Sequence, residues 1–122
     1  MILKIDLQIE SRNKFEGWHW RKKNRHSKVW ESHIWAACNG KVPKAIGPME
    51  VKIKSFRERL LDEDNLSGGC KGILDAMKRL GIIVNDDPKS VKVSYGQEII
   101  RKRDKIKPHT LIEFEDVMKA GL

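Results

Sequence analysis

Segments with the two-residue period of a β-strand alternate along this chain with segments that carry the apolar stripe of a helix. Alternating apolar and charged residues predict half-buried strands over residues 3–9 and 49–54. Short apolar or β-branched runs predict three further strands, at residues 82–84, 91–95 and 112–114. Helices are predicted over residues 27–38, capped by Ser27, and over residues 66–80, closed by Gly81. This interleaving predicts an α+β fold, a mixed β-sheet with two packed α-helices.

The chain length and the lack of long apolar runs limit the class of protein. Its 122 residues suffice for one small domain, predicted over residues 1–122. The chain has no run of about 18 apolar residues, so no transmembrane helix is predicted. Residues 1–10 also lack the continuous apolar stretch of a signal peptide. We therefore expect a cytoplasmic protein. Cys38 and Cys70 show no zinc-type spacing, so both are expected to be small buried residues.

The charge is strongly basic and unevenly distributed. The formal net charge is +8 and the isoelectric point is about 9.6, which favours a polyanionic partner such as nucleic acid. Residues 12–28 hold one acid against seven basic residues, and residues 101–107 form a second basic run. Each run alone is typical of a solvated loop, but two runs around an acidic centre favour contacts with a DNA backbone. The candidate DNA-binding residues are Arg21, Lys22, Lys23, Arg25 and Lys28.

Two acidic turns, residues 62–65 and 85–88, enclose the second predicted helix. Mg²⁺ prefers oxygen ligands and keeps several waters, so two or three carboxylates suffice to bind it. A helix over residues 66–80 would carry the chain away by roughly 22 Å, and an extended segment over residues 82–87 could return it by roughly 20 Å. The second turn, with Asp86 and Asp87, would then meet Asp62 and Asp64. The alternative is an ordinary helix cap at Asp64 or Asn65 and an ordinary Asp-Asp-Pro turn.

The second predicted helix also carries a lysine on the face opposite its apolar stripe. A step of about 100° per residue places Lys71 and Asp75 close to Asp64 around the helix axis. Lys71 could contact a phosphate there, or form only an exposed pair with Asp75. Gly68, Gly69 and Gly72 are poor helix formers, so we expect something to approach this helix closely: backbone, phosphate or a partner subunit.

At these residues the sequence resembles the RusA family of Holliday junction resolvases. The family pattern is Asp-x-Asp-Asn, a helix with Lys and Asp-Ala-aliphatic, then Gly, and an Asp-Asp pair before a Val-rich strand. This chain matches it over roughly its central third, with Asp62-Glu63-Asp64-Asn65-Leu66, Lys71, Asp75-Ala76-Met77, Gly81, Asp86-Asp87 and Val91. Relative to family members with Lys two residues after the Asn-Leu pair, the chain has three additional residues before Lys71.

The resemblance implies a RusA-like fold and a homodimeric, Mg²⁺-dependent endonuclease that cuts four-way DNA junctions by symmetric nicks, in recombination and repair. Such small resolvases occur in bacteria and in phages or prophages. The family's catalytic, metal-binding aspartates correspond to Asp62, Asp64 and Asp87, with Asp86 as a further candidate ligand. Its essential lysine corresponds to Lys71.

A mechanism follows as a hypothesis. One or two Mg²⁺ ions would activate a water and shield the leaving 3′ oxygen, while Lys71 neutralises the phosphate. The basic segment 21–28 would hold the DNA arms. Trp18 or Trp20 could stack on exposed bases, or could pack in the core or a dimer interface. Two other functions stay open: a non-catalytic module that binds branched DNA, and an interaction protein whose acidic loops are only turns.

Overall fold

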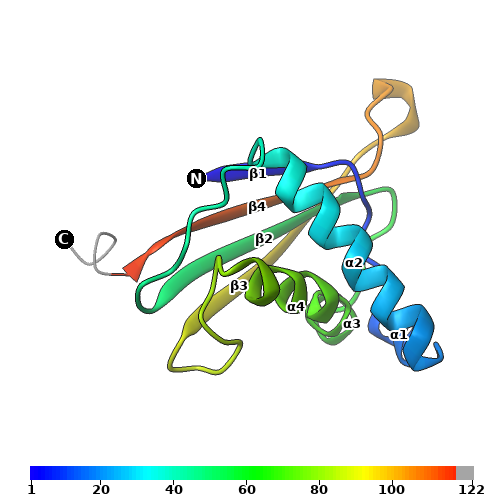
Figure 1. Cartoon of the computed structure of the whole chain (residues 1–122). Helices are drawn as coiled ribbons and strands as arrows, with labels where there is room; N and C mark the ends of the chain where they lie inside the picture. Colours follow the sequence, from blue (N-terminus) through cyan, green and yellow to red (C-terminus); the bar gives the residue numbers. More distant parts are fainter. Residues whose placement is uncertain (118–122) are drawn as a thin grey trace.

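The chain folds into a four-stranded mixed sheet with helices packed on one face (Figure 1). The computed structural model describes residues 1–117, so residues 118–122 of the predicted domain lie outside the described part. In the strand order β1-β4-β2-β3, β2 and β3 are parallel while β4 runs antiparallel to both of its neighbours. The strands are β1 Ile2–Ile5, β2 Met49–Arg57, β3 Val91–Ile99 and β4 His109–Asp116. The predicted α+β fold with a mixed sheet is confirmed.

In the described residues 1–117, five helical segments accompany the sheet, and two of them form the main helical layer. The segments are α1 Arg12–Glu16, α2 Trp20–Ala37, α3 Glu63–Gly69, α4 Lys71–Leu80 and a short 3₁₀ helix, η1 Lys102–Asp104. Helices α2 and α4 pack against each other over the sheet (Figure 1). Within residues 1–117, no helix has the length and apolar character needed to cross a bilayer.

Helix α2 begins well before the predicted start at Ser27. Its N-cap is His19, whose Nδ1 accepts a hydrogen bond from the backbone N–H of Arg21 at 3.2 Å. Ser27 is instead buried in the middle of the helix, where its hydroxyl donates to the carbonyl of Gly72 at 3.2 Å. The basic segment 21–28 is therefore helical and not a loop.

The single helix predicted over residues 66–80 is divided into α3 and α4 at Cys70. The backbone N–H of Cys70 donates to the carbonyls of Gly68 and Ser67, which closes α3 with a tight turn. Gly81 ends α4 in the left-handed conformation with φ of 83°, as its position in the sequence predicts.

The predicted strand at residues 82–84 is wrong, because this segment is a series of bends without a ladder partner. Ile82 and Ile83 are nevertheless buried, at 1% and 0% exposure, whereas Val84 is 56% exposed, so only the first two residues of the apolar run belong to the core. At the other end of the chain, β1 stops at Ile5, although Ile9 beyond it is fully buried.

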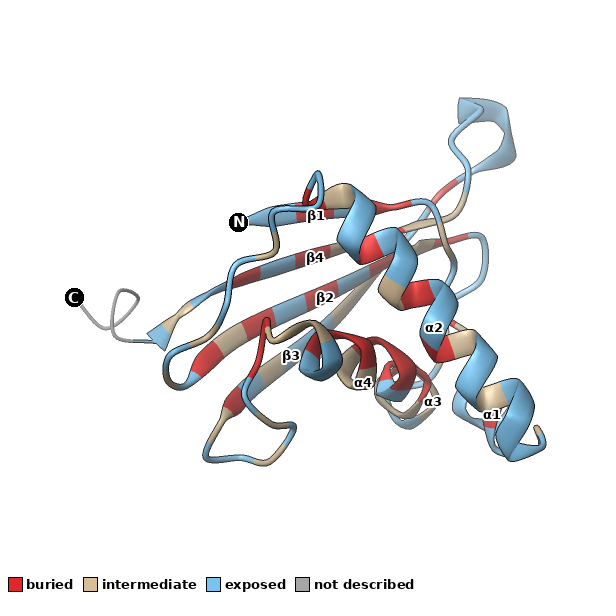
Figure 2. Ribbon diagram, viewed as in Figure 1, coloured by how far each residue is buried: buried red, intermediate tan, exposed pale blue. Residues whose placement is uncertain are grey.

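The core lies between the helical layer and one face of the sheet (Figure 2). Odd-numbered residues of β2 point into it, and the even-numbered residues Lys52 and Lys54 are exposed on the open face. Both cysteines are free and buried, as predicted. The largest fully buried side chains include Trp30, Ile34, Ile53, Ile73, Met77 and Ile112.

Candidate functional site

Asp62 forms the N-cap of α3 and uses both carboxylate oxygens to do so. Its Oδ1 accepts from the backbone N–H of Asn65 at 2.8 Å, and its Oδ2 accepts from Asn65 Nδ2 at 3.1 Å. Asn65 Oδ1 accepts from the backbone N–H of Asn13 at 3.1 Å, which ties α3 to α1. The cap that the sequence placed at Asp64 or Asn65 is therefore at Asp62.

Asp64 lies in the first turn of α3 and is exposed. Within residues 1–117 its carboxylate makes no hydrogen bond, whereas its backbone carbonyl accepts one from Ser67 Oγ at 3.4 Å. The pKa of nearby Arg12 is raised, chiefly by its hydrogen bond to Glu16 and additionally by the charge of Asp64. Of the predicted aspartates near α3, Asp64 thus has the carboxylate that is open to a ligand.

The second acidic turn is closed by Asp87. Its Oδ1 accepts from the backbone N–H groups of Lys89 and Ser90, at 3.1 and 2.9 Å, and its Oδ2 accepts from Asn85 Nδ2 at 2.9 Å. Asp86 is exposed, and its backbone N–H donates to Asn85 Oδ1 at 2.9 Å. This is the ordinary Asp-Asp-Pro turn that the sequence left open as an alternative, and it leads into β3.

The two acidic turns attach to different ends of β3. The Gln97 side chain forms two hydrogen bonds with the backbone of Leu61. The N–H of Leu61 donates to Gln97 Oε1 at 2.9 Å, and Gln97 Nε2 donates to the carbonyl of Leu61 at 2.6 Å. The second turn is joined to the start of β3 instead, where the backbone N–H of Val91 donates a hydrogen bond to the carbonyl of Asp87 at 3.1 Å. The two anchor points, Gln97 and Val91, are six positions apart on β3, which corresponds to roughly 20 Å. In Figure 1 the connection from α4 to β3 lies at the lower left, away from α3.

The fold of the chain therefore does not bring the carboxylates of the predicted magnesium site together in one place. Across residues 1–117, no group of three or more His, Cys, Asp or Glu side chains is placed to hold a metal ion. The return path that would have brought Asp86 and Asp87 to Asp62 and Asp64 required an extended strand after α4, and the chain bends there instead. Carboxylate oxygens suit Mg²⁺ chemically, and the magnesium set itself stays a prediction.

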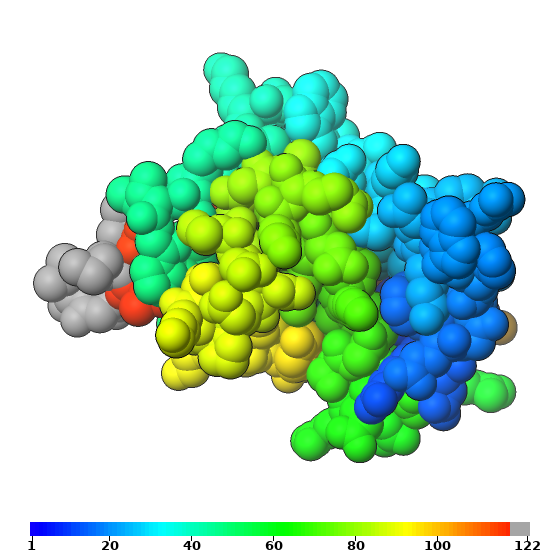
Figure 3. All heavy atoms as spheres, turned by 60° about the horizontal axis from the view of Figure 1, so that its bottom comes forward, coloured from blue at the N-terminus to red at the C-terminus, as the bar shows by residue number. Residues whose placement is uncertain are grey.

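Lys71, in contrast, lies beside a predicted DNA-binding residue. It is the exposed first residue of α4 and lines a shallow hollow of about 340 Å³ between α1, α2 and α4. Figure 3 shows the green atoms of α3 and α4 side by side with the blue atoms of the N-terminal helices on this face. The lining residues are Phe15, Trp20, Lys23, Asn24, Ser27, Lys71, Asp75 and Arg79.

The hollow is positively charged. Lys23, Lys71 and Arg79 line it against the single acid Asp75. The charges of Lys23 and Lys71 both help to lower the pKa of neighbouring Glu16, although the main cause is its hydrogen bond to Arg12. The arrangement can bind an anion such as a phosphate group.

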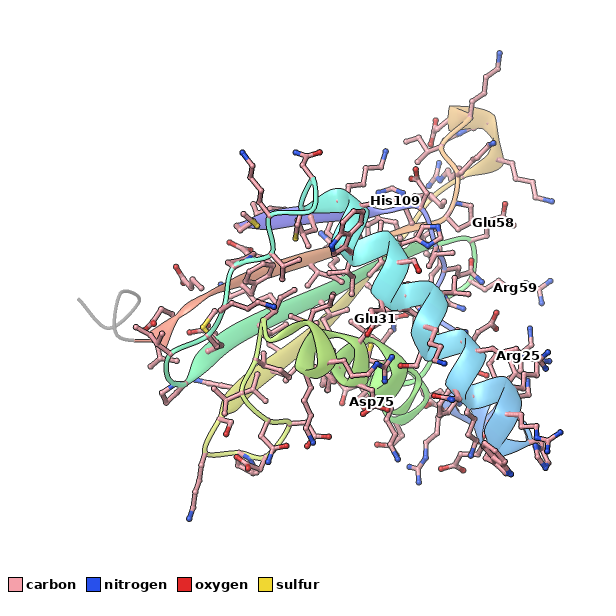
Figure 4. All side chains as sticks on the ribbon, viewed as in Figure 1. Arg25, Glu31, Glu58, Arg59, Asp75 and His109 are labelled. Atoms are coloured by element: carbon pink, nitrogen blue, oxygen red, sulfur yellow. The ribbon has the colours of Figure 1, made fainter. Side chains whose placement is uncertain are left out.

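Arg79 is a residue of this site that was not predicted from the sequence. Its guanidinium bonds to Glu31 Oε1 at 2.9 Å and to Ser27 Oγ at 2.5 Å, which joins α4 to α2 beside the hollow. Glu31 points toward α4 in Figure 4. The signal was present, because Lys71, Asp75 and Arg79 are spaced four residues apart and so share one helix face.

The remaining basic residues lie on two separate segments. Of the predicted DNA-binding residues on α2, all except the partly buried Lys23 are exposed: Arg21, Lys22, Arg25 and Lys28. Residues 101–107, around η1, are all exposed in a connection that projects from the β3–β4 end of the sheet (Figure 1). The second basic run is thus a projecting arm.

Comparisons with models of protein families, with curated proteins and with solved structures found no match to this chain.

Proposed function

We propose that this protein is a metal-dependent endonuclease for branched DNA, similar to the RusA family. The observation that carries the proposal is the hollow between α2 and α4. Two lysines from distant parts of the sequence, Lys23 and Lys71, line the same anion-sized hollow. Lys71 was predicted from its position near the two acidic turns, and Lys23 was predicted as part of the basic segment. Two sequence motifs thus contribute positive charge to one place, and this charge suits a phosphate of the DNA backbone.

The residues have distinct roles in this proposal. Asp62, Asp64 and Asp87 would hold Mg²⁺, with Asp86 as a further ligand, and the ion would supply an activated water and charge stabilisation. Lys71 and Lys23 bind the phosphate and orient it, while the exposed cations of α2 hold the DNA arms. Symmetric nicks in two strands need two such sites, so the active form is a homodimer.

The proposal also requires a change in the second acidic turn. Asp64 can accept a ligand without losing a hydrogen bond, whereas Asp87 uses both oxygens within its own turn. For Asp87 to join Asp62 and Asp64, the connection between α4 and β3 must rearrange when DNA and metal bind.

A non-catalytic module that binds branched DNA is the second candidate. It is favoured by the capping role of Asp62 and the turn role of Asp87, because each carboxylate already has local hydrogen-bond donors that explain its presence. In this case the hollow and the basic helix bind DNA, and no bond is broken.

Cleavage of a labelled synthetic four-way junction with Mg²⁺, with and without EDTA, tests the proposal. We expect the wild type to cut only without EDTA, and Asp64→Asn to bind the junction without cutting it. Glu63→Gln, at the adjacent exposed position of the same turn, is the matched control and should cut normally.

The proposed role of Lys71 can be tested with a matched control on the same helix. Lys71→Ala should reduce cleavage by about 10²-fold or more, as expected for loss of a charge that stabilises the transition state. Lys78→Ala, exposed on the same helix, should leave the rate unchanged. Wild-type protein that prefers the junction over linear duplex but never cuts it would establish the binding module instead.

A further inference from the structure

The four tryptophans divide into two that are covered and two that are exposed. Trp30 is 1% exposed, and its indole N–H donates to His26 Nε2 at 3.1 Å. Trp18 is half-buried against Phe15 and His26. Packing within the chain explains this pair. Trp20 and Trp35 are 65% and 54% exposed, so packing within the chain does not explain them.

Trp20 lines two hollows, and both contain cations. The first is the hollow with Lys23 and Lys71, and the second is a hollow of about 430 Å³ lined by Trp20, Arg21, Asn24 and Arg25. No acidic residue lines the second hollow. The guanidinium carbon of Arg21 lies 5.4 Å from the centre of the Trp20 ring. Both hollows beside this exposed indole are thus lined by cations.

Trp35 provides the contrast on the same helix. Its neighbouring hollow is lined by Glu31, Ser32, Ala36 and Leu80, with an acid and no cation. The two exposed tryptophans therefore differ in charge environment and resemble each other in exposure. An exposed indole with cations close by suits a nucleotide, which offers an aromatic base next to a phosphate, whereas the surroundings of Trp35 do not suit one.

We propose that Trp20 is a stacking platform for an unpaired base of the DNA substrate. Arg21 and Arg25 hold the phosphate on one side of that base, and Lys23 and Lys71 hold the phosphate on the other. A base inside a linear duplex has both faces covered by its neighbours, so stacking on Trp20 favours single strands and branch points. The inference rests on the proposed function for the source of the unpaired base, because branched DNA supplies it.

Binding in EDTA, where metal-dependent cutting cannot occur, tests the platform. The probes are a short fluorescein-labelled oligothymidylate and a linear duplex of equal length, followed by fluorescence anisotropy. Trp20→Ala should weaken oligothymidylate binding roughly 5- to 100-fold, the range for loss of one base–aromatic stack, and should leave duplex binding unchanged. Trp20→Phe should recover part of the loss, and Trp35→Ala should match the wild type on both probes.

Intrinsic fluorescence gives a second readout that does not depend on affinity. Oligothymidylate at saturation should quench tryptophan emission in the wild type and in Trp35→Phe, and this quenching should be largely lost in Trp20→Phe. Thermal unfolding should show that these variants at exposed positions fold normally.

Three results would contradict the proposal that Trp20 stacks on an unpaired base. Trp20→Ala could bind oligothymidylate as tightly as Trp35→Ala, or it could lose affinity for the duplex by the same factor. It could also change only the self-association of the protein in sedimentation, which would make a second copy of the chain the partner of Trp20. A protein that stacks bases in EDTA but never cuts a junction would instead overturn the nuclease proposal alone.

Discussion

Gly69, the last residue of α3, lies directly against the backbone of another segment of the chain. A Cβ at this position would lie 1.9 Å from the backbone carbonyl oxygen of Glu10, far inside contact distance. Gly72 also faces a close neighbour, with an added Cβ 3.2 Å from the His26 ring of α2. The prediction that something approaches these glycines is confirmed, and what approaches is the backbone or a side chain of this same chain.

Gly69→Ala should destabilise the protein by about 1–3 kcal/mol, because the segment around Glu10 must move to admit the methyl group. Gly47→Ala is the control, since no atom lies within 4 Å of the added Cβ. Urea unfolding of both variants and the wild type measures the difference. Equal stability of the two variants would show that the contact with Glu10 relaxes at no cost.

Asp62 combines a capping role with a proposed catalytic role, and two substitutions separate them. Asp62→Ala removes the cap and should lower the free energy of unfolding by about 1 kcal/mol. Asp62→Asn keeps a good capping side chain, so its stability should stay near that of the wild type while the negative charge is lost. Urea unfolding and junction cleavage together test this. An Asn variant that cuts at the wild-type rate would remove Asp62 from the proposed metal site.

At the scale of elements, the pairing of α2 with α4 positions the phosphate hollow. The contact between Ser27 and Gly72 and the bridge between Arg79 and Glu31 hold the helices together, and Lys23 therefore lies beside Lys71. His26 lies in the same interface. Burial lowers the pKa of His26 from 6.5; the charge of Glu10 opposes this shift and the charge of Lys22 adds to it.

This helix pair should therefore weaken in acid. Because the pKa of His26 is lower in the folded chain, the unfolded chain binds more protons once the pH falls below about 6.5. Stability is then complete above that pH and declines as the pH falls through the folded-state pKa. Melting temperatures at about pH 7.5 and pH 5 should differ less for His26→Gln than for the wild type. His33→Gln, exposed on the same helix, should behave as the wild type.

At the scale of the whole molecule, basic side chains from separate segments gather at the end that carries α1 and the start of α2. Arg25 of α2 and Arg59, which follows β2, are labelled at this end in Figure 4. The arm of residues 101–107 projects at the upper right of the same view. The open face of the sheet is different, because two of its lysines face glutamates on neighbouring strands: Lys52 faces Glu113 and Lys92 faces Glu50.

Neutralising the arm should weaken DNA binding without changing its specificity. In the variant with Arg101, Lys102 and Arg103 all replaced by Gln, affinity for junction and linear duplex should fall by the same factor. The slope of log K against log salt should decrease by about 0.9 for each phosphate that the arm no longer neutralises. The matched control replaces Lys4, Lys52 and Lys92 on the open sheet face. A control that loses as much affinity as the arm variant would show that net charge, and not the arm, governs binding.

The sequence alone determined the features that depend on near neighbours. The alternation in β2, the left-handed Gly81 and the burial of Ile82 and Ile83 follow from local periodicity and backbone preference, and the structure agrees with them. The start of α2 was not predictable in this way, since His19 is a weaker capping signal than Ser27, and only the packing of Ser27 against Gly72 shows that the helix continues through it.

Only the tertiary structure decided which residues share a site. Sequence spacing placed Lys71 on the outer face of its helix, but its position beside Lys23 depends on how α2 crosses α4. The separation of Asp87 from Asp62 depends on bends after Gly81 and on the parallel pairing of β2 with β3. Periodicity reports the surroundings of each residue within a few positions, whereas the distance between remote residues is set by non-local pairing and packing.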